Sequence, residues 1–327
     1  LNPMGDSALF EYMERTVWPA IEKRMRRAFN TLTIPHGDFL DPEAPERGWI
    51  PLGPEPRYLS NYVGLRNRLA VLDEQYPYVD FATRIRGSYH LMVSFLDLLH
   101  DQRDRVVGLV EAADRRTIAR GLDPSPDDRF AIDHERAALK RPVTIRGYEM
   151  QVDGDGKGPY KRVRPTDVKK TYADVPYLAR YVPKTTVRLP RGYLLTVNDR
   201  PVIDKLLQHG IVVERLEEPV RLPVDVFTAD KLTGSVRSMQ GHYPSTVQGR
   251  SGIEEREFAA GTYVVRTAQP LANVAAYLLE PQSTDGLVFW NYFDLYLAYQ
   301  WWPEPKEYPV YKWYDPVTLT TATVESR

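Results

Sequence analysis

Apolar residues at helical spacing mark the first part of the chain. One apolar residue every four positions predicts an amphipathic helix over about 7–27, and Asp6 can cap its start. Pro19 lies inside this pattern, where a proline kinks or divides a helix. The apolar face consists of Leu9, Met13, Val17, Ile21 and Met25.

Two further helices are predicted in the same part of the chain, over about 81–99 and about 103–120. The earlier of the two has an apolar stripe, which we expect to be buried against a neighbouring element. Gly121 can end the later one. The stripe that we expect to be buried consists of Ile85, Tyr89, Met92, Phe95, Leu96 and Leu99.

Between the first and second predicted helices, the short apolar run Leu69–Leu72 predicts a buried strand. Glu74 follows where the strand ends, just before a cluster of aromatic residues. A carboxylate at the end of a buried strand is costly unless it is hydrogen-bonded, paired or used in chemistry. The pattern alone favours an ion pair of Glu74 with Arg66 or Arg68.

Beyond the third helix the pattern changes to short runs of β-type residues separated by turn residues. A short helix is predicted over 202–209. We therefore divide the chain into an α/β part at 1–125, a linker at 126–140, and a β-rich accessory domain at 141–327 with an aromatic C-terminal tail. The expected fold class is α/β followed by a β-rich domain.

The composition excludes several classes of function. The 327 residues are 43% hydrophobic and carry a formal net charge of −1, so electrostatics give no reason to expect nucleic acid as a partner. No apolar run approaches the roughly 18 residues of a membrane span. The sequence contains no cysteine, which excludes disulfides and thiolate metal sites.

The histidines show no spacing that is typical of a zinc site. None is followed three residues later by Glu, and none has another His four residues on. We therefore expect no zinc ligand set within this chain. The six histidines are His36, His90, His100, His134, His209 and His242.

Four stretches of the sequence carry a resemblance to a known family. The run PRYLSNYVGLRNRLAVLDEQYPY at 56–78 and the helix after it resemble the carboxypeptidase A-like zinc metallopeptidases, in particular their bacterial branch with a C-terminal β extension. The other stretches are PRGYLLTV at 190–197, the block at 248–282, and DGLVFWNYFD at 285–294.

The resemblance implies a role for Glu74. In that family the strand that ends in Glu, followed by a turn with Tyr, carries the general base. The zinc ligands come earlier in the family's sequence, so this chain resembles the C-terminal part of such an enzyme, beginning after the zinc ligands. Zinc is then the cofactor of the intact parent, and none is expected to be held by this chain alone. The implied fold for 1–125 is a partial mixed-sheet layer with flanking helices.

The resemblance also suggests substrate-binding residues. Tyr62 or Tyr58 would supply the mobile tyrosine that the family uses near the scissile bond, with ordinary loop packing as the alternative for each. Leu72 and Ala70 share a strand face with Glu74 and would help to line the pocket for the substrate's C-terminal side chain. Core packing is the alternative for Leu72.

The expected function is therefore that of part of a zinc metallocarboxypeptidase, a protease that acts on peptides with a free C-terminus. The resemblance favours a secreted or periplasmic location. The alternative is a non-catalytic protein that binds a peptide or glycan through a degenerate peptidase-like domain. A glycosidase would need a second carboxylate that works with Glu74, and the pattern identifies none.

Overall fold

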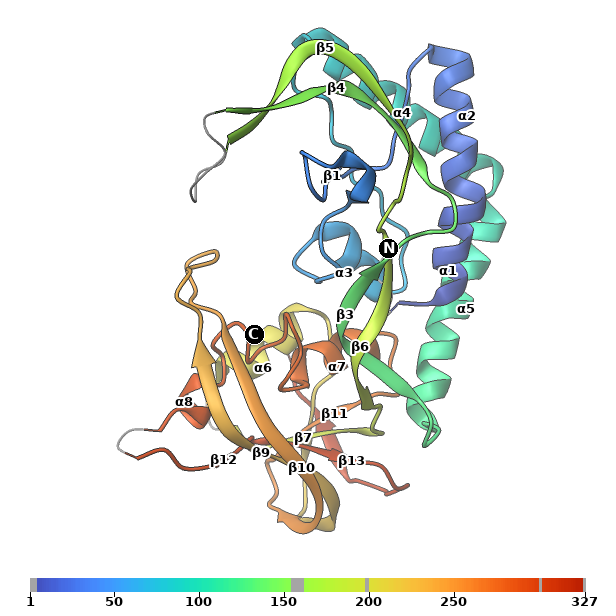
Figure 1. Ribbon diagram of the computed structural model, residues 1–327. Coiled ribbons are helices and arrows are strands. Elements are labelled where there is room, and N and C mark those ends of the chain that lie inside the picture. The colour runs from blue at the N-terminus through green and yellow to red at the C-terminus, as the bar shows by residue number, and fades with distance from the viewer. Residues whose placement is uncertain (1–4, 154–161, 198–199, 300–301, 326–327) are drawn as a thin grey trace.

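A computed structural model describes residues 5–153, 162–197, 200–299 and 302–325. Figure 1 shows a column of helices from the first part of the chain along one side. Two antiparallel ribbons lie next to this column, and a larger antiparallel sheet from the C-terminal half lies at one end. The fold therefore combines helices and antiparallel sheets, with its larger sheet in the C-terminal half.

The first predicted helix is present and is divided near its proline. Helix α1 spans Ser7–Tyr12, a π-helical turn spans Met13–Val17, and α2 spans Trp18–Phe29. The Asp6 side chain accepts a hydrogen bond from the backbone N–H of Ala8, as predicted for a cap. The π turn comes directly before the turn that contains Pro19, a residue that lacks the backbone N–H of a regular helix. The predicted apolar face is confirmed, with Leu9, Val17, Ile21 and Met25 buried.

Helices α4 (Phe81–Asp101) and α5 (Arg103–Leu122) confirm the next two predicted helices. Helix α4 packs its Leu91 side against α2. The stripe predicted to be buried faces the other way and is exposed, so that prediction is wrong: Ile85 is 55% exposed and Met92 is 61% exposed. The reason is that α4 is apolar on two sides and the described residues cover only one of them. Tyr89, Leu96 and Leu99 are also exposed, and Phe95 is half-buried.

The predicted strand at Leu69–Leu72 is also wrong. This run is extended but forms no strand, and while Leu69 packs on the helical core, Val71 and Leu72 are exposed. A strand needs a hydrogen-bonded neighbour, and the described residues offer none at this position. Among them, residues 5–125 contribute only two short antiparallel strands, β1 (Asp38–Phe39) and β2 (Trp49–Ile50), so the expected mixed sheet is not formed.

Two antiparallel ribbons follow the helices. Strand β3 (Arg129–Ala137), which lies within the predicted linker, pairs with β6 (Arg180–Arg188). Strand β4 (Val143–Asp153) pairs with β5 (Arg162–Val175), and this ribbon lies over the end of the molecule opposite the larger sheet (Figure 1). Aromatic packing anchors this ribbon, because the rings of Tyr172 on β5 and Phe39 on β1 meet edge to face with their centroids 4.9 Å apart.

The larger sheet has eight antiparallel strands in the order β10-β9-β13-β7-β11-β8-β14, with β12 paired to β9. Side chains alternate between its two faces, so Leu195 and Val265 pack with helices α6 and α7 in one core while Leu194 and Val264 belong to a second core. The prediction of a short helix at 202–209 is confirmed by α6. The bounds are β7 Gly192–Leu195, α6 Arg200–Gln208, β8 Glu214–Leu216, β9 Val220–Gly234, β10 Ser245–Phe258, β11 Tyr263–Arg266, α7 Ala272–Leu279, α8 Asp294–Leu297, β12 Lys306–Glu307, β13 Val310–Trp313 and β14 Thr321–Thr323.

The C-terminal end of α5 rests directly on the larger sheet. A Cβ at Gly121 would lie 2.0 Å from the carbonyl oxygen of Thr267, so only glycine allows this approach. Arg191, directly before β7, holds the same end through the carbonyl of Leu122 and an ion pair with Asp123. The helical column and the sheet are therefore docked through backbone contact.

A second junction joins the loop before α3 (Leu59–Leu65) to the segment after α7. Arg57 forms a 3.0 Å ion pair with Asp285, and its backbone N–H donates to the same carboxylate at 2.6 Å. Trp290 donates its indole N–H to Asp285 at 2.9 Å. Burial raises the pKa of Asp285 to about 6, while Arg57 acts to lower it and Glu55 adds to the increase.

The Asp285 carboxyl predicts a measurable pH dependence of stability. Because its pKa in the fold lies above its ordinary value, its contribution to the free energy of unfolding is complete below about pH 4 and is lost as the pH rises through about 6, a loss of about 3 kcal/mol. We expect Asp285→Asn to remove this fall from the curve of unfolding free energy against pH, measured by denaturant titration. Asp104→Asn, at a side chain that is 92% exposed, is the control and should leave the curve unchanged. An unchanged slope in Asp285→Asn would contradict the assignment.

Candidate functional site

The segment that carries Glu74 connects α3 to α4 and is anchored by its neighbours in sequence. Asp73 accepts a hydrogen bond from the Ser88 hydroxyl on α4 at 2.6 Å and another from the side-chain amide of Gln75 at 2.8 Å. Gln75 in turn lies over Gly87, where a Cβ would come within 2.4 Å of its side-chain oxygen. Residues on both sides of Glu74 are therefore held against α4, which fixes the backbone that presents the carboxylate.

Glu74 itself is exposed. Within the described part of the chain, no hydrogen bond or ion pair engages its side chain. The ion pair with Arg66 or Arg68 is not formed: Arg66 donates to the Tyr62 hydroxyl, and Arg68 pairs with Asp114 at 3.0 Å. The result is a carboxylate on an anchored backbone that is available to a ligand or to water, as a general base must be.

Aromatic side chains lie next to Glu74. The rings of Tyr76 and Tyr78 are 5.3 Å apart, and Tyr78 is largely exposed. Burial raises the pKa of Tyr76, and the nearby hydroxyl of Tyr148 on β4 adds to this increase. The β4–β5 ribbon therefore reaches the segment that carries Glu74.

Tyr62 connects α3 to the sheet domain. Its hydroxyl lies 2.6 Å from Nδ1 of His209, and Arg66 donates to the same hydroxyl at 2.8 Å. The guanidinium can only donate, so the hydroxyl keeps its own proton for Nδ1 when the neutral His209 ring carries its hydrogen on Nε2. Burial lowers the pKa of His209, and Lys205 and Arg66 add to this effect, so the neutral ring that this hydrogen bond needs is favoured.

The other predicted binding residues take no part in the Tyr62–His209 contact. Tyr58 precedes α3 and accepts backbone hydrogen bonds from Asn61 and Tyr62 through its carbonyl, with a half-buried side chain. Leu72 is 42% exposed, so it is not a core residue. Leu72 and Glu74 share one exposed segment, whereas no hydrogen bond or ring contact among the described residues joins either tyrosine to Glu74.

Among the described residues, no group of three His, Asp or Glu side chains is arranged to hold a metal ion. The histidines are dispersed instead. His90 stacks on Phe29 with ring centroids 4.1 Å apart, His209 bonds Tyr62, and His242 lies beside Asn291. The residues that the structure describes therefore do not fit zinc by themselves.

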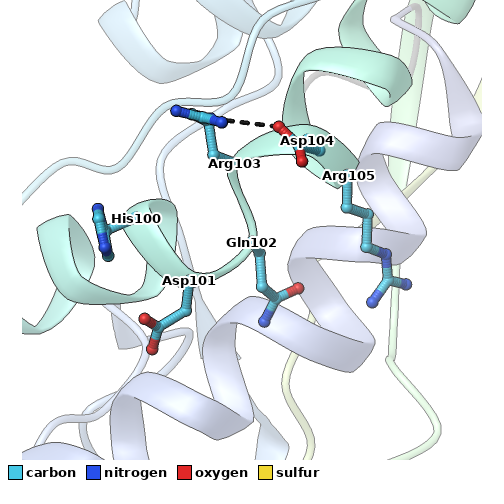
Figure 2. Close-up of a pocket in the computed structure, with 6 residues that line it drawn as sticks. All are labelled: His100, Asp101, Gln102, Arg103, Asp104 and Arg105. Atoms are coloured by element: carbon cyan, nitrogen blue, oxygen red, sulfur yellow. Dashed lines mark hydrogen bonds and ion pairs between the residues drawn. The ribbon is translucent and has the colours of Figure 1, made fainter.

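A hollow of about 640 Å³ lies at the turn between α4 and α5, and Figure 2 shows the six consecutive residues that line it. Arg103 and Asp104 form an exposed ion pair, and Gln102 accepts a hydrogen bond from Tyr12. These side chains carry alternating charges in open solvent, where such attraction is weak. The hollow does not include Glu74 or the other predicted site residues. It is lined by His100, Asp101, Gln102, Arg103, Asp104 and Arg105.

Sequence reasoning missed a buried charged cluster in the larger sheet. Lys312 on β13 lies between the carboxylates of Asp225 on β9 and Glu280 after α7. A signal was present, because a single charged residue interrupts an apolar strand both in Val224-Asp225-Val226 and in Tyr311-Lys312-Trp313. The third member, Glu280, follows an apolar helix and gives no periodic signal of this kind.

No described helix is long and apolar enough to cross a membrane. No family model, no curated protein and no solved structure matches this chain.

Proposed function

We propose that this chain is the C-terminal part of a zinc metallocarboxypeptidase, with Glu74 as the general base that helps to hydrolyse C-terminal residues of peptides. The observation that carries the proposal is an uncovered apolar layer directly beside Glu74. It consists of the exposed face of α4 and the strand-like run Leu69–Leu72.

The two parts of this layer call for the same covering element. A helix that is apolar on two sides belongs in the interior of a larger domain. The run Leu69–Leu72 has the composition of a strand, and it is extended without a pairing neighbour among the described residues. A sheet that paired with this run and lay on α4 would bury both surfaces. It would also leave Glu74 at a strand end, where α/β enzymes hold catalytic groups.

In this proposal Glu74 transfers a proton. It takes a proton from the attacking water and later gives that proton to the leaving amine. Bound zinc would lower the pKa of water and polarise the scissile carbonyl, and its ligands would lie outside this chain. Asp73 and Gln75 hold Glu74 in place, and the exposed Leu72 remains a candidate for contact with the substrate's terminal side chain.

The two tyrosines take different parts in the proposal. Tyr58 remains the candidate for contact near the scissile bond because its half-buried side chain takes no part in the Arg66–His209 junction. Tyr62 acts as a structural link between α3 and α6, because a role in substrate binding would require its two hydrogen bonds to break.

One observation favours a second function of another class. The exposed pair of Tyr76 and Tyr78 offers aromatic surface to a peptide or a sugar ring without any need for a metal. Binding of a peptide or glycan to the 327-residue chain in the absence of zinc, abolished in Tyr78→Ala and retained in Glu74→Gln, would support this binding function over the peptidase.

The role of Glu74 is tested in the longer protein that includes the region upstream of this chain. We expect Glu74→Gln to lower kcat for a peptide substrate by about 100-fold or more, with little change in KM, because the base is lost while the fold is kept. Glu111→Gln, an exposed carboxylate on α5, is the matched control and should retain full activity. Near-normal turnover in a folded Glu74→Gln enzyme would remove Glu74 as the general base.

The chain by itself is expected to be inactive. Purified alone, it should bind zinc only weakly and show no release of C-terminal residues, because the described residues hold no zinc site. Zinc binding is measured by calorimetry and peptide hydrolysis by mass spectrometry. Zinc-dependent turnover by this chain alone would contradict the proposal that the ligands lie elsewhere.

Substitutions on the exposed face of α4 test whether this face is covered in the longer protein. In the isolated chain, replacing both Ile85 and Met92 by Gln should raise solubility without lowering the free energy of unfolding, because both side chains are more than half exposed. Leu91→Gln on the buried side should cost about 2–5 kcal/mol. In the longer protein, where the proposal has this face of α4 covered, the Ile85 and Met92 double substitution should lower the free energy of unfolding. If it remains neutral there, upstream sequence does not cover this face.

A further inference from the structure

Three charged side chains meet inside the larger sheet, far from Glu74 in the chain. Lys312 on β13 stands directly opposite Asp225 on β9 in the strand register. Its Nζ lies 3.2 Å from Oδ2 of Asp225 and 3.3 Å from Oε2 of Glu280, which follows α7. The register and the two distances place one amine between two carboxyl groups on three different elements.

The cluster is closed off from water. The side chains of Lys312, Asp225 and Glu280 are 10%, 12% and 1% exposed. Tyr193 donates its hydroxyl to Oε1 of Glu280 at 3.1 Å, and Tyr314 donates to Oδ2 of Asp225 at 3.2 Å. In such surroundings a separated pair of charges has lost most of its hydration.

The cluster contains more acidic groups than basic groups. Two carboxyl groups face one amine, and burial raises the pKa of Glu280, which favours its protonated form. Burial also opposes the charge on Lys312, but the carboxyl groups of Glu280 and Asp225 raise its pKa overall. With Glu280 in the protonated form that burial favours, one amine and one further carboxyl group share the remaining charge, and the cluster as a whole is neutral.

One atom in this arrangement lacks a partner. Oδ1 of Asp225 is buried and accepts no hydrogen bond, although a buried carboxylate oxygen is costly to leave unpaired. Joining Lys312 to Asp225 as an amide would remove one carboxyl oxygen and both buried charges. We propose that Lys312 and Asp225 form an intramolecular isopeptide bond, with Glu280 as the proton relay.

The step balances without any further reactant. A proton passes from the Lys312 ammonium to the Asp225 carboxylate across their contact, which gives an amine and an acid. The Nζ lone pair then forms a bond to Cγ of Asp225 while the carbonyl electron pair moves onto Oδ1. The protonated Oδ2, which accepts a hydrogen bond from the Tyr314 hydroxyl, becomes the departing oxygen. Glu280 takes a proton from the nitrogen and gives its own to the departing oxygen, which leaves as water.

The products are one amide, one water molecule and Glu280 again in its acid form. The new bond would join the neighbouring strands β9 and β13 and close the chain between residues 225 and 312 into a covalent loop. This inference does not depend on the peptidase proposal, because none of the three side chains takes part in the candidate site around Glu74.

Intact mass spectrometry of the purified, denatured chain is the decisive test. We expect a mass below that of the sequence by one water, about 18 Da. A protease digest should contain a branched peptide that joins the segment around Asp225 to the segment around Lys312. Lys312→Met should show the full mass of its sequence, and Glu280→Gln should show full mass or a slow loss of water. Lys306→Met, at the neighbouring strand β12, is the matched control and should still lose one water.

The unsubstituted chain decides the question, so a variant that fails to fold does not block the test. The full sequence mass in a folded, unsubstituted chain, with no branched peptide, overturns the proposal and leaves an ionic cluster only. Loss of water that maps to other residues overturns it as well. Complete loss of water in folded Glu280→Gln would overturn the relay role of Glu280.

Discussion

Burial of apolar surface is the constraint on which the rest of this structure depends, and the chain satisfies it unevenly. In the C-terminal half, both faces of the larger sheet are covered, and residues such as Leu194 and Val265 are fully buried. In the helical part, α4 has two apolar sides and α2 covers only one. Exposed apolar area of this extent marks a surface that another element is made to cover. The position of that surface beside Glu74 connects the packing to the proposed function.

The helical part and the sheet are nevertheless firmly joined. The contact of Gly121 with Thr267 leaves no room for a side chain, and the Arg57–Asp285 ion pair is buried. The hydrogen bond of Tyr62 with His209 adds a third junction. Since the segment with Glu74 starts from α3 and is held against α4, these junctions fix its position relative to the sheet. In the proposed function, a covering element would therefore meet a surface whose position is already fixed.

Local periodicity predicts α1, α2, α4, α5 and α6, but not the short helices α3, α7 and α8. The four-residue spacing from Leu9 to Met25 predicts the divided helix that the structure contains, and the helices at α4 and α5 follow from the same pattern. Periodicity does not indicate which other element pairs with a strand or packs on a helix. Leu69–Leu72 has strand composition, but strand formation depends on a hydrogen-bonded partner from elsewhere in the chain. The error at the α4 stripe has the same cause, because an apolar side is buried only when something packs on it.

The candidate site shows the same division between local and distant information. Glu74 could be found from the sequence because it follows an apolar run, but its lack of an ion pair depends on where Arg66 and Arg68 point. Arg66 donates to the Tyr62 hydroxyl one turn earlier and to the distant carbonyl of His209, and Arg68 pairs with Asp114 on α5. The cluster of Lys312, Asp225 and Glu280 brings together residues separated by as many as 87 positions in the chain.

A comparison of Glu74 with Glu280 shows how the surroundings of a carboxyl group determine which reactions it can take part in. Glu74 is exposed and has no partner among the described residues, so in the proposed function it acts on a substrate or water that is brought to it. Glu280 is buried beside a cation, so its surroundings favour the acid and the groups it can act on are already in contact with it. A carboxyl group of the first kind needs a partner from outside the chain, whereas one of the second kind has all its partners within the sheet. In the two proposals, the same type of side chain therefore serves repeated turnover in one place and a single covalent event in the other.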